Sequence, residues 1–318
     1  MAVSNSVFVG IDVSKDTLDL HVRPLGLTAQ FSNDSSGHDQ LVDFLKGHSP
    51  ALIVLEATGS YERLLVLVLA SHQLPVVVVN PWRVHNFAKA TSQLAKTDRL
   101  DAAILAHFAD VMEPKIRPIP SEEAMAFAEL VSRRRQLIGI KTSEQNRLLQ
   151  ARSKKVLRTI KELLKTIQKQ IDDLDEELDQ TIRKSSVWSG KDDLLKSTPG
   201  IGSVTSRTLL ADLPELGQMN RQSIAALVGL APYDDSSGKR QGKRTIWGGR
   251  AAVRGALYMA TLTAVRSNSL IKEFYQRLRA KNKPAKVALT ACARKLLTLL
   301  NVMLKNNLTW SQLKGVSA

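Results

Sequence analysis

Residues 9–15 of the chain are Val9-Gly10-Ile11-Asp12-Val13-Ser14-Lys15, in which an apolar run ends at the carboxylate of Asp12. The run from Ser6 to Ile11 predicts a strand that is buried on both faces, with Asp12 at its end. A second apolar run, from Ala51 to Leu55, ends in the same way at Glu56. Two buried strands that each end in an acid predict a site shared between neighbouring elements.

Two further acids, Asp98 and Asp101, lie in the stretch Lys96-Thr97-Asp98-Arg99-Leu100-Asp101. They are three residues apart in a helical pattern, so they are expected to project from one face of a helix. Carboxylates that converge from two strands and a helix suit Mg²⁺, which binds through a few carboxylates, water and substrate phosphate. The four acids therefore predict a metal site that cuts phosphodiesters.

Each of these acids also has a simpler interpretation. An Asp at the end of a strand is often a turn former or a helix cap. Glu56 is harder to explain in this way, because a carboxylate that closes the run Ala51–Leu55 is expected to be half-buried, and an unpaired buried carboxylate is costly. The order of the four acids along plausible elements favours the metal site.

The first 120 residues alternate between strand-like and helical patterns. The expected elements are three strands over Ser6–Val13, Thr17–Val22 and Thr28–Phe31, a helix near His38–Gly47, a strand at Ala51–Glu56, a helix at Ser60–Ser71 and a strand at Pro75–Val79. A helical stretch that bears Asp98 and Asp101 follows. An antiparallel meander followed by alternating strands and helices is typical of an RNase H-like α/β fold, which we predict for residues 1–120.

Positive charge is concentrated in the last third of the chain. The 318 residues carry a formal net charge of +15, and residues 215–318 alone hold 18 Lys and Arg against 4 Asp and Glu. Residues 1–120 have a net charge of −2, and residues 121–214 have +3. Such a basic segment indicates a polyanionic partner, because neutralising phosphates releases counterions. A solvated basic patch of the ribosomal or membrane-surface type is the alternative.

Other classes of protein are excluded by residue usage. The single cysteine, Cys292, lies in an apolar pattern and cannot build a disulfide framework or a cysteine zinc site, so we expect it in the core. No signal-peptide pattern begins the chain, and the richest apolar run, Leu64–Leu69, is too short to cross a bilayer. We therefore expect a soluble, cytoplasmic protein with no membrane partner. All six histidines occur at or before His107, so the basic third has no local imidazole for Ser-His-Asp catalysis.

Residues 121–196 have the pattern of a helical arm. Glycine almost disappears there, and apolar residues from Leu148 to Leu178 recur at steps of three and four among charges. This periodicity predicts a long amphipathic helix or a coiled coil, which would serve as an arm or a dimer strut. Basic clusters at 133–135 and 152–155 leave open a helix that faces nucleic acid, although a solvated face is the default.

A glycine-rich turn follows the arm. Residues 197–205 are Ser-Thr-Pro-Gly-Ile-Gly-Ser-Val-Thr, with Gly200 and Gly202 around one apolar residue just before a helical pattern. Backbone N–H groups in such a turn can meet a phosphate at a helix start, as in a helix-hairpin-helix module that grips the nucleic-acid backbone. An ordinary turn between helices explains the pattern equally well.

The stretch from Gly229 to Arg254 combines glycines, serines and cations. Ser236 and Ser237 precede Gly238 on an expected loop. The neighbouring cations are Lys239, Arg240, Lys243, Arg244, Arg250 and Arg254. Such a loop could present a hydroxyl to a phosphate held by cations. Composition alone favours a loop that grips phosphate without covalent chemistry.

Five ordered blocks of this sequence resemble the IS110 family of transposases, also called DEDD transposases, which includes the Piv-type DNA invertases. The blocks are GIDVSK at residues 10–15, LEATG at 55–59, KTDRLDA at 96–102, TPGIG at 198–202, and the series GLAP, SG, GGR, VR and LY between Gly229 and Tyr258. The resemblance extends from about Phe8 to Leu304. All four acidic positions match the family pattern, and Ser237 matches its SG serine.

The resemblance implies a site-specific recombinase that moves an insertion sequence. A RuvC-like DEDD domain at 1–120, a coiled-coil arm at 121–196 and a mainly α transposase domain at 197–318 are expected. Asp12, Glu56, Asp98 and Asp101 would bind Mg²⁺, and Ser237 would attack DNA to form a transient phosphoserine link. A structured noncoding RNA would bridge donor and target DNA by base pairing. A dimer or tetramer is expected, because recombination joins four DNA ends, and the site could be shared between protomers.

Two alternatives to this mechanism remain open. A RuvC-like nuclease would use the same four acids with water as the nucleophile, and Ser237 would only contact phosphate. A non-enzymatic nucleic-acid-binding protein would need the basic third of the chain and no metal.

Overall fold

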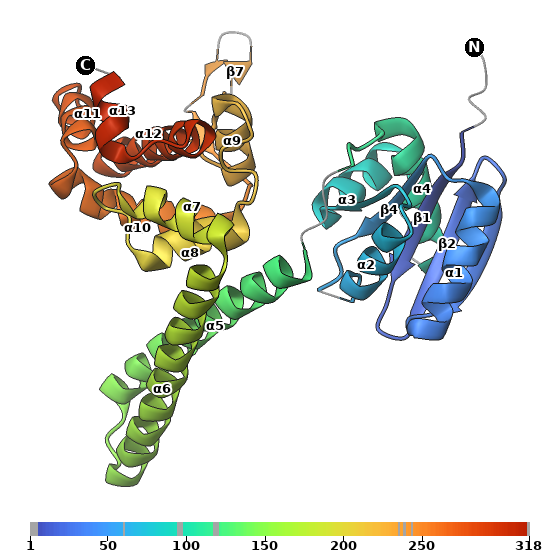
Figure 1. Cartoon of the computed structure of the whole chain (residues 1–318), viewed down its shortest axis with the longest axis horizontal. Coiled ribbons are helices and arrows are strands. Elements are labelled where there is room, and N and C mark those ends of the chain that lie inside the picture. The colour runs from blue at the N-terminus through green and yellow to red at the C-terminus, as the bar shows by residue number, and fades with distance from the viewer. Residues whose placement is uncertain are drawn as a thin grey trace. The chain divides into compact units, whose positions relative to one another are not determined.

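The computed structural model describes residues 6–59, 61–93, 98–116, 121–234, 236–237, 240–242 and 244–316. Contacts within the chain divide it into two compact units, Met1–Ile119 and Pro120–Ala318. The first unit is coloured blue to green in Figure 1, and the second continues from green to red. The predicted arm and the helices after it thus belong to one compact unit, and their separation into two domains stays a prediction.

The first unit contains a mixed five-stranded sheet. Its strands are β1 (Phe8–Val13), β2 (Thr17–Arg23), β3 (Leu27–Ser32), β4 (Leu52–Glu56) and β5 (Val76–Val79). Their order is β3-β2-β1-β4-β5, with antiparallel pairing among β1, β2 and β3 and parallel pairing of β1 with β4 and of β4 with β5. The predicted α/β meander is confirmed, and this strand order is consistent with an RNase H-like domain.

Helices cover both faces of this sheet. The helices are α1 (Ser35–His48), α2 (Arg63–Ser71), α3 (Pro81–Ala90) and α4 (Asp98–Met112). Side chains alternate along a strand, so Val9 and Ile11 point to the face covered by α1 and α2, where they join one buried cluster. Phe8 points to the other face and joins a second cluster with residues of α3 and α4. The sheet is therefore the middle of three layers (Figure 1).

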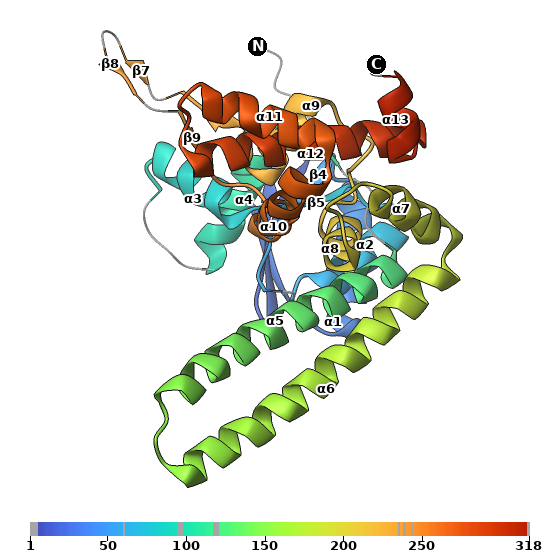
Figure 2. The same ribbon diagram turned by 90° about the vertical axis from the view of Figure 1, so that its left-hand side faces the viewer.

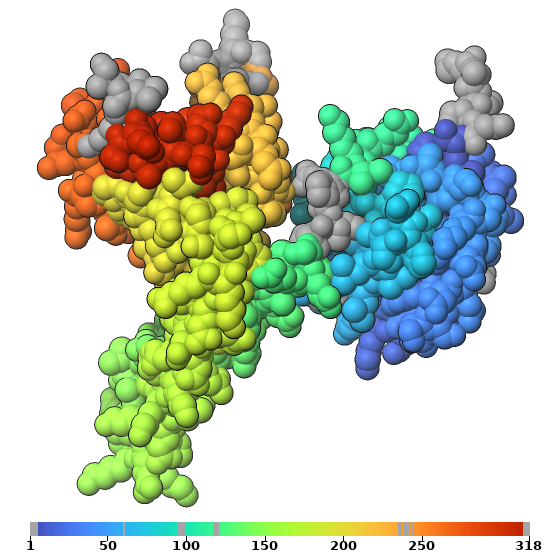
Figure 3. Space-filling model, in the orientation of Figure 1, coloured from blue at the N-terminus to red at the C-terminus, as the bar shows by residue number. Residues whose placement is uncertain are grey.

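The second unit begins with a pair of antiparallel helices, α5 (Glu122–Gln150) and α6 (Lys154–Lys184). Arg134 of α5 forms an ion pair with Asp175 of α6. Lys141, later in α5, contacts Gln168, which is earlier in α6, as expected for antiparallel helices. Figures 2 and 3 show the two helices side by side. The expected helical arm is thus a hairpin rather than one continuous helix, because the extended backbone at Ala151 (φ −72°, ψ 136°) interrupts it.

Seven more helices and two short ladders complete the second unit as far as it is described. The helices are α7 (Ser186–Lys196), α8 (Ser203–Asp212), α9 (Arg221–Val228), α10 (Ala251–Ser267), α11 (Ser269–Ala280), α12 (Ala285–Asn306) and α13 (Trp310–Val316). The short strands are β6 (Pro232–Tyr233), β7 (Ser236–Ser237), β8 (Arg240–Gln241) and β9 (Thr245–Ile246). Residues from α7 to α13 share one hydrophobic core. This unit is mainly helical, as expected.

The central helix of that core is α12. Its Cys292, Leu296 and Leu300 are fully buried, which confirms the prediction that the cysteine is a core residue. Within the described part of the chain, α12 is also the one helix whose length and hydropathy would allow it to span a membrane. Its apolar side chains pack against α7, α9, α10 and α11, so their burial inside the unit accounts for its composition.

Candidate active site and nucleic-acid interface

Asp12 and Glu56 lie at equivalent positions on adjacent parallel strands. The ladder between β1 and β4 pairs Ile11 with Leu55, so the next residue on each strand is one of the two acids. Both side chains are half-buried, as expected for Glu56 from the sequence. Residues at the same register of parallel strands point to the same face. The fold therefore places these two carboxylates side by side at the carboxyl edge of the sheet.

Helix α4 lies directly on this face. A Cβ atom added to Gly10 would lie 2.7 Å from the Cβ of Leu105, and closer still to the backbone of Ala102 and Ala106. Glycine at position 10 is thus what allows α4 to approach β1 so closely. Asp12 is two residues farther along the strand. Arg23, which pairs with Phe8 at the opposite end of β1, forms an ion pair with Asp110 near the end of α4, so the first turn of α4 lies toward Asp12. Asp101, which is half-buried, therefore borders the same edge.

The donor atoms at this edge are the kind that hold a hard cation. Asp12, Glu56 and Asp101 offer carboxylate oxygens, the ligands that Mg²⁺ prefers. Asp98 begins α4, but its side chain lies outside the described part of the structure. Among the side chains that are described, no three acidic, imidazole or thiol groups form a complete metal cluster. The donor chemistry fits a divalent cation, and the full four-ligand set stays a prediction.

A hydrogen-bonded network fixes the loops that leave this edge. The Asn33 side chain donates from Nδ2 to the carbonyl oxygen of Ser14 at 2.8 Å, and to that of Tyr61 at 3.4 Å. His38, which is buried, holds the Asn33 side-chain oxygen through its Nε2 at 2.8 Å. Burial outweighs the opposing charges of Asp34 and Asp39 and holds the pKa of His38 below its ordinary value of 6.5, so the ring is neutral at pH 7. No motif in the sequence indicated this link between the segments that follow β1 and β4.

Ser237 lies on a β-hairpin in the second unit. β7 pairs with β8, which places Ser237 opposite Arg240, and the β6–β9 ladder continues the hairpin toward its base. Figure 2 shows β7 and β8 projecting from the helices around them. Ser237 is exposed, whereas the side chain of Ser236 lies outside the described part. The expected loop is thus a hairpin that presents the Ser237 hydroxyl to solvent.

The base of this hairpin is held by close backbone contacts. Gly249 has φ +70°, and a Cβ atom there would lie 2.6 Å from the Cα of Gly229. Gly229 has φ +77° and caps α9, so both glycines need the left-handed region that other residues rarely adopt. The Arg254 guanidinium donates to the carbonyl oxygens of Val228 and Gly248. These contacts fix where the hairpin leaves the helical core.

The six predicted phosphate-binding cations differ in their surroundings. Arg250 donates two hydrogen bonds to Glu215, at 2.5 and 2.6 Å, and a third to the carbonyl oxygen of Asp212 at 2.9 Å. Arg250 and Arg254 thus stabilise the hairpin base, and sequence reasoning did not foresee these internal partners. Arg244 is exposed and pairs with Asp234. Lys239, Lys243 and the side chain of Arg240 lie outside the described part. Nucleic-acid binding by all six stays a prediction.

The glycine-rich turn joins α7 to α8. A Cβ atom at Gly200 (φ +103°) would lie 2.7 Å from the Cβ of Ala264 in α10, so this glycine serves close packing between elements. Gly202 is exposed, caps α8 and has open space around it. The N–H groups beyond Gly202 are therefore the part of the turn that a phosphate could reach. Contact of either glycine with nucleic acid stays a prediction.

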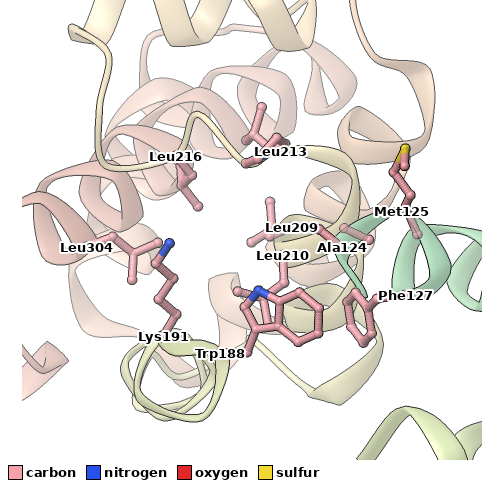
Figure 4. Close-up of a pocket in the computed structure, with 13 residues that line it drawn as sticks. Ala124, Met125, Phe127, Trp188, Lys191, Leu209, Leu210, Leu213, Leu216 and Leu304 are labelled. Atoms are coloured by element: carbon pink, nitrogen blue, oxygen red, sulfur yellow. The ribbon is translucent and has the colours of Figure 1, made fainter. Parts of the chain in front are cut away.

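An apolar cavity of about 140 Å³ lies elsewhere in the second unit. Figure 4 shows Phe127, Trp188, Leu209 and Leu210 around it, with Lys191 as its charged member. None of the predicted site residues lines it, and its apolar walls do not suit a phosphate. We therefore assign it no part in the reaction.

Comparison with known proteins decides the family. A model of the IS110 type, described as a transposase, matches residues 9–181, and a model described as the transposase IS116/IS110/IS902 family matches residues 192–276. The chain belongs to the IS110 family of transposases. It is also 27% identical to the pilin gene-inverting proteins of Moraxella bovis and Moraxella lacunata, over 95% of this chain and 97% of each relative. The resemblance inferred from the five sequence blocks is confirmed.

Membership of the IS110 family identifies a DNA recombination enzyme of the transposase type. DEDD-type transposases normally use a divalent metal ion, in agreement with the donor chemistry at the edge of the sheet. The first family match contains Asp12, Glu56, Asp98 and Asp101, and the second contains Ser237. The predicted metal ligands and the predicted nucleophile thus lie in separate matched segments.

The structure of this IS110 transposase also reveals a basic surface that the sequence-based site prediction missed. From Ser236 to the end of the chain, Glu273 is the single acidic residue. Six exposed cations lie on α11, in the turn after it and at the start of α12: Lys272, Arg277, Arg279, Lys281, Lys283 and Lys286. In the described part of the chain, none of them forms an ion pair. In the sequence, this basic surface was indicated by the clustering of cations around the junction of two helices and not by any motif.

Proposed function

We propose that this IS110 transposase cuts and rejoins DNA through a covalent phosphoserine at Ser237, assisted by Mg²⁺ at Asp12, Glu56, Asp98 and Asp101. The observation that carries the proposal is the placement of Asp12 and Glu56 side by side at one sheet edge, with α4 and Asp101 above them. An exposed serine on a hairpin within the matched transposase segment supports it.

The proposed step exchanges one phosphodiester for another. The Ser237 Oγ attacks the scissile phosphorus, an Oγ–P bond forms, and the bond between phosphorus and one DNA oxygen breaks. The serine proton passes to solvent, and the departing DNA oxygen takes up a proton. Rejoining is the reverse step, with the hydroxyl of another DNA strand as the attacking group. Each step replaces one P–O ester bond by another, so no external energy source is required.

A serine hydroxyl needs activation for this attack, because it is a weak nucleophile at neutral pH. Mg²⁺ supplies that activation when bound, by lowering the pKa of the hydroxyl or by polarising the phosphate. The carboxylates would orient the cation, and the Asn33 and His38 network would hold the loops around them. The cations of the hairpin and the α11 surface would hold the DNA backbone, which fixes position without reading sequence.

We further propose that sequence choice comes from a structured noncoding RNA that pairs with donor and target DNA. The protein would hold this RNA by shape and backbone, for which the exposed cations of α11 and α12 are suited. The active form would be a dimer or a tetramer. RNA that co-purifies with the protein, and loss of recombination after ribonuclease treatment, would support the guide; full recombination without RNA would contradict it.

Cleavage of DNA that flanks the gene tests the function itself. The protein, purified with any bound RNA, is incubated with this DNA and Mg²⁺. We expect cleavage to fall at least about a hundredfold in Asp12→Asn and Glu56→Gln, because a metal ligand is lost in each. Asp43→Asn, which changes an exposed acid of α1, is the matched control and should cut normally. Equal cleavage by Asp12→Asn would refute the metal site.

The same assay separates the covalent mechanism from hydrolysis. Ser237→Ala should lose both cleavage and joining. If Ser237→Ala still cuts, water is the nucleophile and the protein is a RuvC-like nuclease. Binding of DNA without any cleavage, in every divalent metal tried, would favour a non-enzymatic binding protein.

A further inference from the structure

Trp82 is an exposed tryptophan at the start of α3. This residue is 54% exposed, which is unusual for one with so large an apolar side chain. Its backbone is fixed, because the Asn80 side chain caps α3 and accepts a hydrogen bond from the Trp82 N–H at 2.9 Å. Pro81 in the first turn stiffens the same segment. The fold thus holds an indole at the surface on a rigid support.

This indole lies at the same edge of the sheet as the carboxylates. β4 and β5 are parallel, and Glu56 pairs with Val79, the last residue of β5. Trp82 follows Val79 by three residues. Helix α3 also packs on the face that carries the acids, since Val84 and Ala88 join the buried cluster of Phe8 and Val54. Trp82 therefore follows the sheet at the same edge that carries Glu56.

The rest of the exposed face of α3 suits a nucleic-acid strand. Trp82, His85 and Lys89 recur at steps of three and four, so they line one side of the helix, and all three are exposed. Arg83, also exposed, lies over the ring of Phe108 at 5.4 Å. Tyr61, 52% exposed in the segment after β4, is a second aromatic group at this edge. Aromatic groups interleaved with cations are the usual surface for unpaired bases and their phosphates.

We propose that Trp82 stacks against an unpaired base next to the scissile phosphate and so positions the strand at the carboxylate site. The proposal rests on the proposed function, because strand exchange requires bases beside the break to leave their partners. Stacking is tolerant of sequence, since every base has an aromatic face. Trp82 would thus be a positioning residue that holds a strand and leaves sequence choice to other contacts.

Fluorescence of a base analogue tests this directly. DNA that carries 2-aminopurine beside the cleavage position is bound to full-length protein with the Asp12→Asn change, which prevents cutting. We expect the indole to quench the analogue, and Trp82→Phe to retain most of the quenching. Trp82→Leu keeps an apolar side chain without an aromatic face, so it should lose the quenching and weaken binding about 5- to 150-fold. Leu64→Ala, at a residue that is 70% exposed in the same unit, is the control and should bind normally.

Either of two fluorescence results would overturn the proposal: unchanged quenching in Trp82→Leu, or equal loss in Trp82→Phe and Trp82→Leu. Circular dichroism of each variant checks that the fold is retained. DNA cleavage by protein that keeps Asp12 distinguishes a failure of this proposal from a failure of the proposed function. If the protein cuts DNA and Trp82→Leu cuts it with the same KM and kcat, only the stacking role fails. If the protein cuts in no divalent metal, the proposed function fails, and the quenching still reports whether Trp82 stacks.

Discussion

Gly10 of β1 and Leu105 of α4 are in such close contact that a Cβ atom on the glycine would lie 2.7 Å from that of the leucine. The contact fixes the height of α4 over the sheet, and with it the distance of Asp101 from Asp12 and Glu56. A glycine in the middle of a buried strand normally weakens the strand. Here its missing side chain is what brings the helix to the carboxylate edge.

Gly10→Ala should therefore damage both stability and activity. The added methyl group must push α4 away, and we expect a loss of at least about 2 kcal/mol in the free energy of unfolding, as for other overpacked cores. DNA cleavage should fall further than stability explains, because the carboxylates separate. Gly47→Ala is the control: Gly47 lies exposed in α1 with open space around it, so the change should stabilise by up to about 1 kcal/mol. Urea unfolding of both variants compares the two; normal cleavage by Gly10→Ala would contradict the account.

Asp175 should stabilise the second unit in a pH-dependent way. Burial raises its pKa, but hydrogen bonds and charge from Arg134 and Arg207 outweigh burial and hold the pKa below its ordinary value of 3.8. Since the folded pKa is depressed, the stabilisation is complete above pH 3.8 and disappears as the pH falls through the lower, folded value. Asp175→Asn should cost about 1.5–3 kcal/mol at pH 7, and less at pH 3.

Urea unfolding at pH 7, 5, 4 and 3 measures this difference. Asp173→Asn changes an exposed carboxylate of the same helix and should have almost no effect at any of these pH values. A penalty for Asp175→Asn that stays constant down to pH 3 would show that the lost interaction is not that of the ionised carboxylate.

Cys292 should be unreactive until the C-terminal core opens. Burial raises the pKa of its thiol to about 11, and the side chain is fully buried in α12. At pH 8, we expect alkylation to be at least about a hundredfold slower than that of an exposed thiol, because the thiolate is scarce and shielded. Val287→Cys in a Cys292→Ser background places a thiol on the exposed part of the same helix and should react quickly. Rapid modification of Cys292 in native buffer would contradict the core described above.

If the carboxylates of one copy and the serine of another act on the same phosphate in an oligomer, a variant that lacks a carboxylate and a variant that lacks the serine should restore each other's activity. Asp12 and Ser237 belong to different compact units, and Ser237 follows Asp101 by 136 residues. Mixed assemblies of Asp12→Ala and Ser237→Ala protein should therefore recover cleavage above the level of either variant alone. Absence of any recovery, in assemblies shown to contain both variants, would argue against a site shared between protomers.

Much of the first unit could be predicted from local pattern. Apolar runs that end in acids indicated the strands and the positions of Asp12 and Glu56, because a buried strand requires a local run of apolar residues in the sequence. The proximity of α4 could not be predicted in the same way. Gly10 is one residue in an apolar run, and its contact with Leu105 joins positions 95 residues apart.

The second unit was less predictable, because its decisive contacts are between distant positions. The break at Ala151 carries no glycine or proline, and only the pairing of α5 with α6 reveals it. Arg250 looked like a phosphate ligand because it lies in a basic stretch, whereas its partner Glu215 precedes it by 35 residues. Charge density indicates a polyanionic partner for a region, but it does not show which cations already have partners inside the protein.

The most direct measurement of the central claim is the mapping of a covalent protein–DNA adduct. The protein is incubated with its flanking DNA, bound RNA and Mg²⁺, stopped with SDS, digested and examined by mass spectrometry. We predict a nucleotide on Ser237 that is absent in Ser237→Ala and in Asp12→Ala. Cleaved DNA with free ends and no adduct on any residue would contradict the account, and would identify water as the nucleophile.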